Sequence, residues 1–224
     1  LTEVMGRWQR VLFLRALNET STVAAEGSNT DFLLIPSIRY STLPSYVVGG
    51  RARPYFLYGE LRGSPSTLGS DASFLQVRLQ AERLLNFSEL WDLRLRAEVG
   101  ASRIAEFQEL PVSQRFFAGG ERSVRGFALD ELSPVNELGK NIGGENLATG
   151  SIEITRALPR NFGVAAFYDI GNAFNSFSDP NLQYSVGVGA RYNIAVASFG
   201  VDVAQALSQS GRGPRLHLYI STQF

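Results

Sequence analysis

The chain has 224 residues, and its 21 Lys plus Arg are balanced by 21 Asp plus Glu, so it carries no formal net charge. A neutral chain without a basic run has no electrostatic footprint for nucleic acid. It contains no cysteine and one histidine, His217, which excludes disulfides, thiolate nucleophiles, cysteine-based zinc sites and metal sites built from several histidines. No apolar run approaches the roughly 18–20 residues of a transmembrane helix. The 15 Phe, 8 Tyr and 44% apolar residues are typical of β-structure.

The strands are predicted from apolar residues that alternate with polar ones. In WDLRLRAEVGA (91–101) the odd positions are apolar and the even positions are mostly charged, so the two sets face opposite sides of a strand. FLQVRLQAE (74–82) and RLHLYISTQF (215–224) alternate in the same way. Ten strands are expected, at about 7–16, 31–41, 54–62, 73–84, 91–102, 149–158, 162–170, 182–192, 196–206 and 215–224. Their lengths match the roughly 9–11 residues with which a tilted strand crosses a bilayer.

The connections between these strands favour a membrane barrel. The first, over 17–30, is expected to be long, and from the fourth onward short turns at 85–90, 159–161 and 193–195 alternate with longer segments. Outer-membrane barrels have short periplasmic turns and longer outer loops. A soluble β-sandwich also alternates apolar and polar residues, but it gives no reason for the alternation of loop lengths. We therefore expect the apolar face to contact lipid and the polar face to line a lumen.

One connection, from about 103 to 148, is far longer than the others. Such a loop is usually functional or disordered, and disorder predicts few aromatic residues. This loop nevertheless carries four phenylalanines, Phe107, Phe116, Phe117 and Phe127. We expect it to fold back into the barrel, with Arg125 at the tip of a turn.

A buried arginine needs an anionic partner. In SIEITRAL the apolar Ile152 and Ile154 face lipid, so Glu153 faces the lumen, and the same parity turns Asp169 inward in VAAFYDIG. Arg125 could bridge one or both carboxylates with its planar set of donors. The alternative is a solvated Arg125 and two carboxylates that only make the lumen polar.

The segments RFFAGGERSVRGF, GGENLATGSIEI and FYDIG, with a last strand that ends in Phe224, resemble the bacterial outer-membrane assembly and translocation superfamily. This superfamily includes the BamA insertases, the TamA subunits and the two-partner-secretion transporters. The resemblance covers roughly residues 30–224, and LPVSQRFFAGGERSVRGF is most similar to the TamA branch.

The resemblance implies site residues. The motif of the inserted loop would be Val124, Arg125, Gly126 and Phe127. Glu153 and Asp169 would be the lumenal partners of the motif arginine. Phe224 would belong to the C-terminal signal by which such barrels are recognised for insertion, in addition to any role as an aromatic anchor at the interface.

The resemblance also implies the architecture. The family barrel has sixteen strands, eleven before the motif loop and five after it, whereas five and five are expected here. Residues 1–224 are therefore interpreted as the C-terminal portion of an all-β, transmembrane antiparallel barrel with about ten strands present, the loop at about 103–148 inserted in its lumen, and the periplasmic domains absent from this chain. A self-closed ten-stranded barrel is the alternative.

The function implied is non-enzymatic: assembly and insertion of nascent outer-membrane proteins or autotransporters, through a labile strand seam and an arginine-tethered loop. The expected setting is the outer membrane of a Gram-negative bacterium, with membrane lipid and a periplasmic or inner-membrane subunit as partners. No nucleic acid, cofactor, metal or catalytic residue is expected, since His217 is the only imidazole. The alternative is a two-partner-secretion transporter or passive pore. Its lumen would be lined by Arg78, Arg94, Arg96, Glu98, Glu153, Asp169, Arg191 and Asp202.

Overall fold

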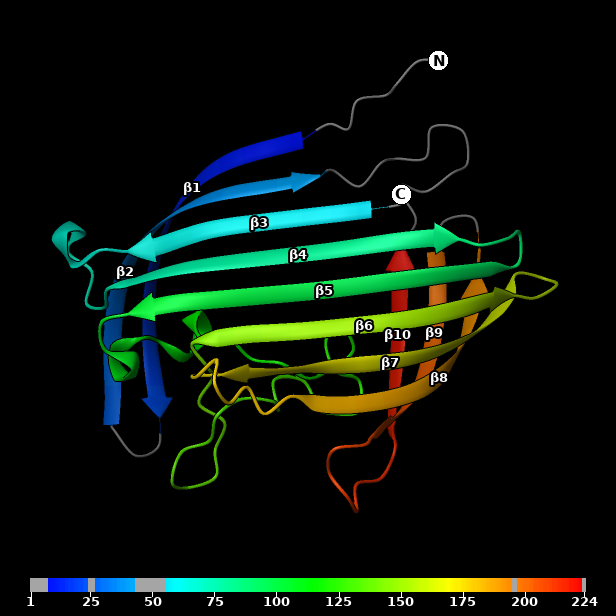
Figure 1. The fold of residues 1–224 in the computed structure, drawn as a ribbon. Coiled ribbons are helices and arrows are strands. Elements are labelled where there is room, and N and C mark those ends of the chain that lie inside the picture. Colours follow the sequence, from blue (N-terminus) through cyan, green and yellow to red (C-terminus); the bar gives the residue numbers. More distant parts are fainter. Residues whose placement is uncertain (1–7, 24–26, 43–54, 195–196, 223–224) are drawn as a thin grey trace.

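A single antiparallel sheet makes up most of the molecule (Figure 1). The computed structural model describes residues 8–23, 27–42, 55–194 and 197–222. The strands are β1 (Trp8–Val23), β2 (Gly27–Thr42), β3 (Tyr55–Ser64), β4 (Phe74–Asn86), β5 (Trp91–Ile104), β6 (Asn146–Ala157), β7 (Phe162–Phe174), β8 (Gln183–Asn193), β9 (Ala197–Ala206) and β10 (Arg215–Thr222). Each strand pairs with the next one along the chain. The prediction of an all-β fold with ten antiparallel strands is therefore confirmed.

In the part of the chain that the structure describes, the helical content is limited to three short 3₁₀ turns, η1 (Ser66–Leu68), η2 (Phe107–Glu109) and η3 (Val112–Gln114). Across the ranges that the structure describes, no helix has the length and apolar character needed to span a membrane.

The first hairpin differs from the prediction. The sequence suggested a long connection over 17–30, but β1 continues to Val23 and β2 already begins at Gly27. The ladder runs without a break from Trp8↔Thr42 to Val23↔Gly27. The prediction failed because NETSTV and GSNT lack apolar alternation, whereas backbone pairing needs no apolar side chain.

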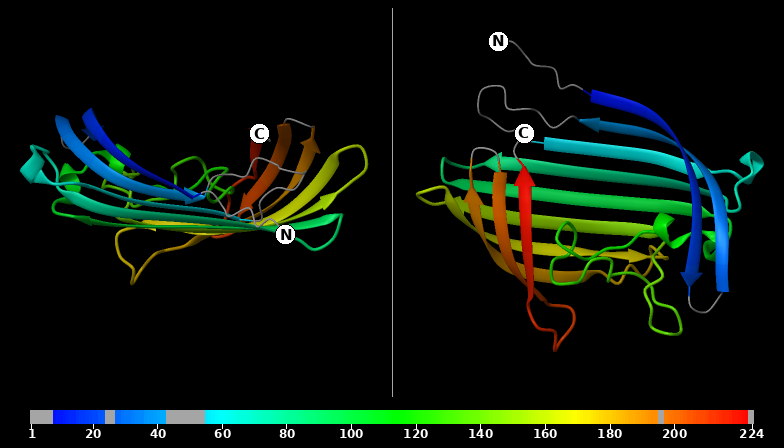
Figure 2. Two further views of the ribbon diagram at one scale, coloured as in Figure 1. Left: turned by 90° about the horizontal axis from the view of Figure 1, so that it is seen from above. Right: turned by 180° about the vertical axis from the view of Figure 1, so that it is seen from behind.

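The sheet is bent into an open trough. Strands β3 to β8 lie nearly side by side, and the two ends, β1 with β2 and β9 with β10, rise on the same side of them (Figures 1 and 2). Strand twist that accumulates in one direction produces this curvature. Among the described strands, β1 pairs only with β2 and β10 only with β9, so the sheet is not closed.

The convex face of the trough is apolar and exposed. On β4, Leu75, Val77 and Leu79 alternate with polar residues and are 54%, 38% and 50% exposed. The same pattern continues on the other strands, at Val99, Ile152, Ile154, Val164, Val188, Val201, Val203, Leu216, Leu218 and Ile220. A water-soluble sandwich would bury these residues in its core. Their exposure is what is expected of a face that contacts lipid.

The concave face carries the packed interior. The connection from Ala105 to Glu145 lies on this side of the sheet (Figure 2). One apolar cluster joins this loop to β6, β7 and β9, and it consists of Phe116, Ala118, Val124, Phe127, Leu132, Leu147, Ala173 and Ala206. A second cluster, near the other end of the sheet, consists of Leu33, Ile35, Ala72, Phe74 and Leu110. The aromatic residues of the loop thus pack within the trough.

Candidate functional site

The long loop has a defined structure of its own. Phe116 and Gly144 exchange backbone hydrogen bonds, with the Phe116 nitrogen 3.0 Å from the Gly144 oxygen and the Gly144 nitrogen 2.8 Å from the Phe116 oxygen. Ala118 and Leu132 form a similar bridge at 2.9 and 2.8 Å. These bridges hold the segment between them as a compact turn, and Arg125 lies in this turn.

The apolar members of the loop motif are fully buried. Val124 and Phe127 have no exposed surface and belong to the cluster between the loop and the sheet. Gly126 sits directly against β8 and β9: a Cβ atom added to it would lie 2.6 Å from the Ser185 Cβ and 2.8 Å from the Ala206 nitrogen. Such contacts are too short for any side chain, so only glycine fits at this position.

Arg125 is buried, and its guanidinium uses its planar set of donors on several acceptors. Nε and Nη2 donate to the two carboxylate oxygens of Asp169, each at 2.8 Å. Nη1 donates to Glu153 Oε2 at 2.6 Å and to Asp202 Oδ2 at 3.0 Å. The backbone nitrogen of Arg125 also donates to Asp169 Oδ2, at 3.1 Å. This bidentate, charge-assisted geometry is the strongest form of such a hydrogen bond.

Further contacts fix the orientation of the Arg125 guanidinium. Ser151 accepts a hydrogen bond from Nη2 at 3.2 Å and donates one to Asp169 Oδ1 at 2.7 Å. The guanidinium carbon lies 3.3 Å from the centre of the Phe167 ring, where the face of the ring attracts a cation.

A second arginine completes the cluster. Arg191 on β8 donates from Nη2 to Glu153 Oε1 at 3.1 Å and from Nη1 to Asp202 Oδ1. We call Arg125, Glu153, Asp169, Arg191 and Asp202 the lumenal ion cluster. Its three carboxylates and two guanidiniums sum to one net negative charge (3 − 2 = 1), and all five residues are at most 7% exposed. Neither arginine can be removed without leaving buried, under-compensated carboxylates.

The last strand also contacts the motif. His217 on β10 has its Nε2 atom 2.6 Å from the Arg125 backbone oxygen. Because a carbonyl oxygen only accepts, Nε2 carries the proton and donates. Two positions further on, the Tyr219 ring lies 5.2 Å from the Arg191 guanidinium carbon. The inward face of β10 therefore packs onto the lumenal ion cluster.

A separate contact joins the motif loop to the connection between β9 and β10. Glu131 accepts a hydrogen bond from Arg212 and one from Arg215 at 3.4 Å, and its Oε2 accepts from the Ala128 nitrogen at 2.6 Å. The hydrogen bond from Arg212 is the main reason why the pKa of Glu131 lies below its ordinary value. Arg212 also stacks over Phe127, 5.2 Å from the ring centre. This Glu131–Arg212 contact is part-exposed, unlike the lumenal ion cluster.

The structure brings together most residues singled out in the sequence. Arg125 lies beside both Glu153 and Asp169, and Val124, Gly126 and Phe127 pack around it. Phe224 lies outside the described residues. The alternation of residues along their strands placed Asp202 and Arg191 in the lumen, but it did not pair them with Arg125. Alternation predicts which face of the sheet a residue is on and not which residues it contacts. The contact of His217 with the Arg125 carbonyl was not predicted from the sequence.

The chemistry available here is ionic and structural. Within the described ranges, no group of three or more His, Asp or Glu side chains is placed to hold a metal ion. His217 uses its Nε2 proton on the Arg125 backbone carbonyl. What the arrangement does is to fix a loop to the inner wall of a curved sheet.

A lipid-facing antiparallel sheet with a loop anchored on its concave side defines a membrane β-barrel with a lumenal insertion. The chain belongs to the Omp85 superfamily, because the Omp85 superfamily domain matches residues 13–224. This membership confirms the resemblance seen in the sequence and identifies the sheet as part of an outer-membrane barrel. The TamA branch is not separated from BamA by these matches, and that assignment stays a prediction.

Several relatives are similar over part of their length. Sorting and assembly machinery component 50 homolog A of Xenopus laevis is 31% identical over 54% of this chain and 26% of its own length. Homolog B of the same species is 28% identical over 77% of this chain and 36% of its own. Outer membrane protein assembly factor BamA of Nitratidesulfovibrio vulgaris is 28% identical over 60% of this chain and 18% of its own. The chain thus spans about a third or less of these relatives.

Among solved structures, the fold is similar to that of BamA from Haemophilus ducreyi lacking POTRA domains 1–3. The TM-score is 0.68 at 17% identity, over 88% of this chain and 43% of that one. At this identity the similarity concerns the fold.

Proposed function

We propose that this chain is the barrel part of a factor that inserts nascent β-barrel proteins or autotransporters into the outer membrane of a Gram-negative bacterium, without enzymatic chemistry. The observation that carries the proposal is the lumenal ion cluster, in which Arg125 joins the inserted loop to β6, β7 and β9. Relatives named as an outer-membrane assembly factor and as sorting and assembly machinery components support the same role.

The first part of the mechanism is a tether. The loop is held inside the trough by the Arg125 fork and by the apolar cluster around Phe127. Because a guanidinium stays charged at every physiological pH, the tether does not depend on a protonation event. It keeps β6 to β9 at a fixed curvature.

The second part is a labile edge. β10 follows the Gly211–Pro214 segment, in which Pro214 lacks a donor. In a complete barrel β10 would pair with the first strand, and a weak seam between the two would expose the edge of β10. An incoming strand can add to such an edge by main-chain hydrogen bonds. A periplasmic or inner-membrane subunit would deliver that strand.

The test is insertion of an unfolded outer-membrane barrel into proteoliposomes that contain the full-length protein, with wild type compared with Arg125→Ala. The matched control is Arg94→Ala, since Arg94 is a lumenal arginine in a half-exposed pair with Glu82 at 3.5 Å. We expect Arg125→Ala to lower the insertion rate at least tenfold and to open residues 105–145 to protease, and we expect the control to do neither. Normal insertion by a folded Arg125→Ala protein would show that the tether is not needed.

The second candidate function is a polypeptide transporter of the two-partner-secretion type, or a passive pore. A polar cavity of about 290 Å³ favours it, since Arg78, Arg96 and Glu98 line this cavity beside the loop. Steady ion conductance in planar bilayers, with no effect on the insertion of substrate barrels, would support the pore and contradict the assembly role.

A further inference from the structure

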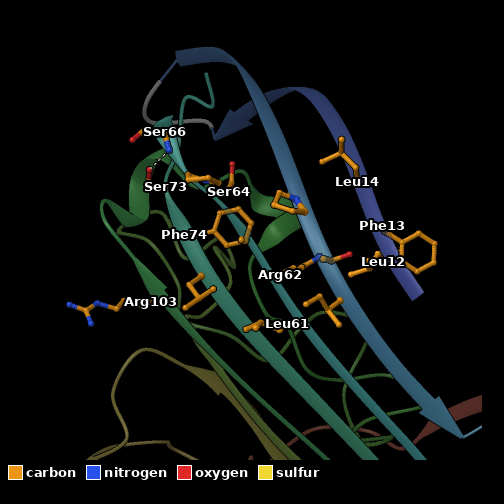
Figure 3. A pocket seen from close by; sticks show the side chains of 16 residues that line it. Leu12, Phe13, Leu14, Leu61, Arg62, Ser64, Ser66, Ser73, Phe74 and Arg103 are labelled. Atoms are coloured by element: carbon orange, nitrogen blue, oxygen red, sulfur yellow. Dashed lines mark hydrogen bonds between the residues drawn. The ribbon is translucent and has the colours of Figure 1, made fainter. Parts of the chain in front are cut away.

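A groove opens on the convex apolar face where β2 separates from β3 (Figure 3). These strands pair only from Ser37↔Arg62 to Ser41↔Tyr58, although both continue past Ser37 and Arg62. Beyond that point β2 bonds to the connection that follows β3. The Leu34 nitrogen donates to Ser70 Oγ at 2.9 Å, and the Phe32 nitrogen donates to an Asp71 carboxylate oxygen at 2.6 Å. The separation leaves a volume of about 910 Å³, within the range of ligand pockets.

The sequence creates this groove without leaving a backbone donor unsatisfied. The amide nitrogens of Phe32 and Leu34 point to the side of β3, and strand alternation puts the nitrogen of Pro36 on that side as well. Proline has no N–H, so the position nearest the separation lacks the donor that would otherwise be unpaired. The groove is therefore a property of the sequence and not a packing defect.

A glycine keeps the floor of the groove open. Gly63 lies on the outer face of β3, where a Cβ atom would be 2.9 Å from the Phe74 backbone oxygen and 3.3 Å from Leu75 Cδ1. A larger residue here would collide with β4 and would also fill the space between the strands.

The walls of the groove are mostly hydrocarbon, and Ser37, Arg62, Ser64, Ser66 and Ser73 add polar groups to them. Five leucine and isoleucine side chains of the lipid-contacting face form the hydrocarbon part, namely Leu12, Leu14, Ile38, Leu61 and Leu75. These side chains are between 47% and 79% exposed. Because the groove opens onto the lipid-contacting face, its filling must come from the hydrocarbon of the bilayer. A flexible acyl chain fits a curved space of this kind.

Two arginines line the groove. Arg62 donates to Gln76 Oε1 at 2.6 Å and to the Gln114 backbone oxygen at 3.5 Å, so Arg103 is the cation on the outer side. Arg103 is near the end of β5, opposite Leu75 in the β4–β5 ladder, and its guanidinium is turned away from the leucines (Figure 3). It is exposed, and none of the ion pairs found in the described parts of the chain includes it. It lies two residues before the long loop begins at Ala105, at the end of the sheet that carries the longer connections, where lipid head groups lie. A guanidinium in this position matches a phosphate.

We propose that this groove is a specific site for one glycerophospholipid, with an acyl chain between β2 and β3 and the head-group phosphate on Arg103. One groove with one cation on its outer side matches a lipid that has a single phosphate. Lipid A, with two phosphates and more acyl chains, would need a second cation and a wider space. The lipid seals the separation between β2 and β3 on the membrane side, where a water-filled gap would be unfavourable.

The test is native mass spectrometry of the full-length protein released from nanodiscs that contain dipalmitoyl phosphatidylglycerol, dipalmitoylglycerol or lipid A. We expect wild type to retain one phosphatidylglycerol at least tenfold better than dipalmitoylglycerol, because a hydrogen-bonded charge pair at the phosphate accounts for that ratio. Arg103→Gln should abolish the preference. Leu75→Trp should fill the groove and lower retention of both lipids.

Two control variants lie on the same lipid-contacting face outside the groove, Arg83→Gln and Leu79→Trp. Both should retain phosphatidylglycerol as wild type does, and circular dichroism should show unchanged β-structure in all four variants. The proposal is overturned by equal retention of the phosphate-free lipid, by equal loss in the controls, or by stronger retention of lipid A.

Discussion

The concave face of β6 to β9 and that of β3 to β5 carry the same residue types in different surroundings. Arg125 and Asp169 form an ion pair whose side chains are 3% and 0% exposed. Arg78 and Glu98 form one of similar length, 2.5 Å, but their side chains are 42% and 18% exposed. The inserted loop covers the first pair and leaves the second open to the lumen.

The difference shows that the distance between the charged atoms does not by itself determine how much an ion pair contributes to stability. An exposed pair is screened by water and stabilises by at most about 1 kcal/mol. A buried pair gains little over an apolar replacement, yet the loss of one partner leaves an uncompensated charge and costs about 3–5 kcal/mol. Loss of one charge from the lumenal ion cluster is therefore costly. Loss of a charge from a half-exposed pair changes stability little.

The largest difference between the two regions is expected when the same substitution, arginine to methionine, is made in both. Arg125→Met leaves three carboxylates against one guanidinium and should lower the free energy of unfolding by about 3–5 kcal/mol. Arg78→Met should lower it by about 1 kcal/mol or less. Urea-induced unfolding in detergent measures both.

Arg125→Lys refines this result. Lysine keeps the charge but cannot form the planar fork to Asp169, so its effect should lie between those of wild type and Arg125→Met. Equal effects of Arg125→Met and Arg78→Met would mean that the loop does not shield the cluster from water.

A smaller effect is expected from Gly126→Ala, which tests packing and not charge. The added methyl group would press on Ser185 and on the backbone of Ala206, at a cost of about 1–3 kcal/mol. Gly213→Ala is the control, since a Cβ atom there would have no neighbour within 4 Å. Similar thermal unfolding midpoints for the two variants would contradict the close approach of the loop to β8 and β9.

The smallest effect concerns the Glu131–Arg212 contact. Glu131→Gln should lower stability by about 0.5–1 kcal/mol, as expected for a part-exposed pair. Because the pKa of Glu131 is below its ordinary value of 4.5, its contribution is complete above pH 4.5 and is lost as the pH falls through the lowered value. Proteolysis of the loop at pH 3 and pH 6 should therefore differ more in wild type than in Glu131→Gln, and an identical pH response would exclude this role.

Most of the fold could be predicted from period-two alternation, because one face of nearly every strand must contact lipid. β4, β5 and β10 were recognised on this basis. The ends of β1 and β2 could not be, since residues 17–23 and 27–30 pair through their backbones and have no apolar pattern to reveal it. Backbone hydrogen bonding is independent of side-chain type, so strand ends that pair only through the backbone cannot be predicted from the sequence pattern.

The site was predictable in part for the same reason. Parity placed Glu153, Asp169 and Asp202 on the inner face, but only the relative register of β6, β7 and β9 decides which of them reach Arg125. The register of a sheet is set by all its ladders together. The contact of His217 with the Arg125 carbonyl is of this kind, because it joins residues 92 positions apart.

The inward side chains of β10 have a mechanical consequence. Arg215, His217 and Tyr219 reach, in turn, Glu131 of the loop, the carbonyl of Arg125 and the guanidinium of Arg191. Any displacement of β10 from β9 must stretch all three contacts at once. A movement of β10 away from β9 would therefore also loosen the inserted loop, because the same three contacts hold both.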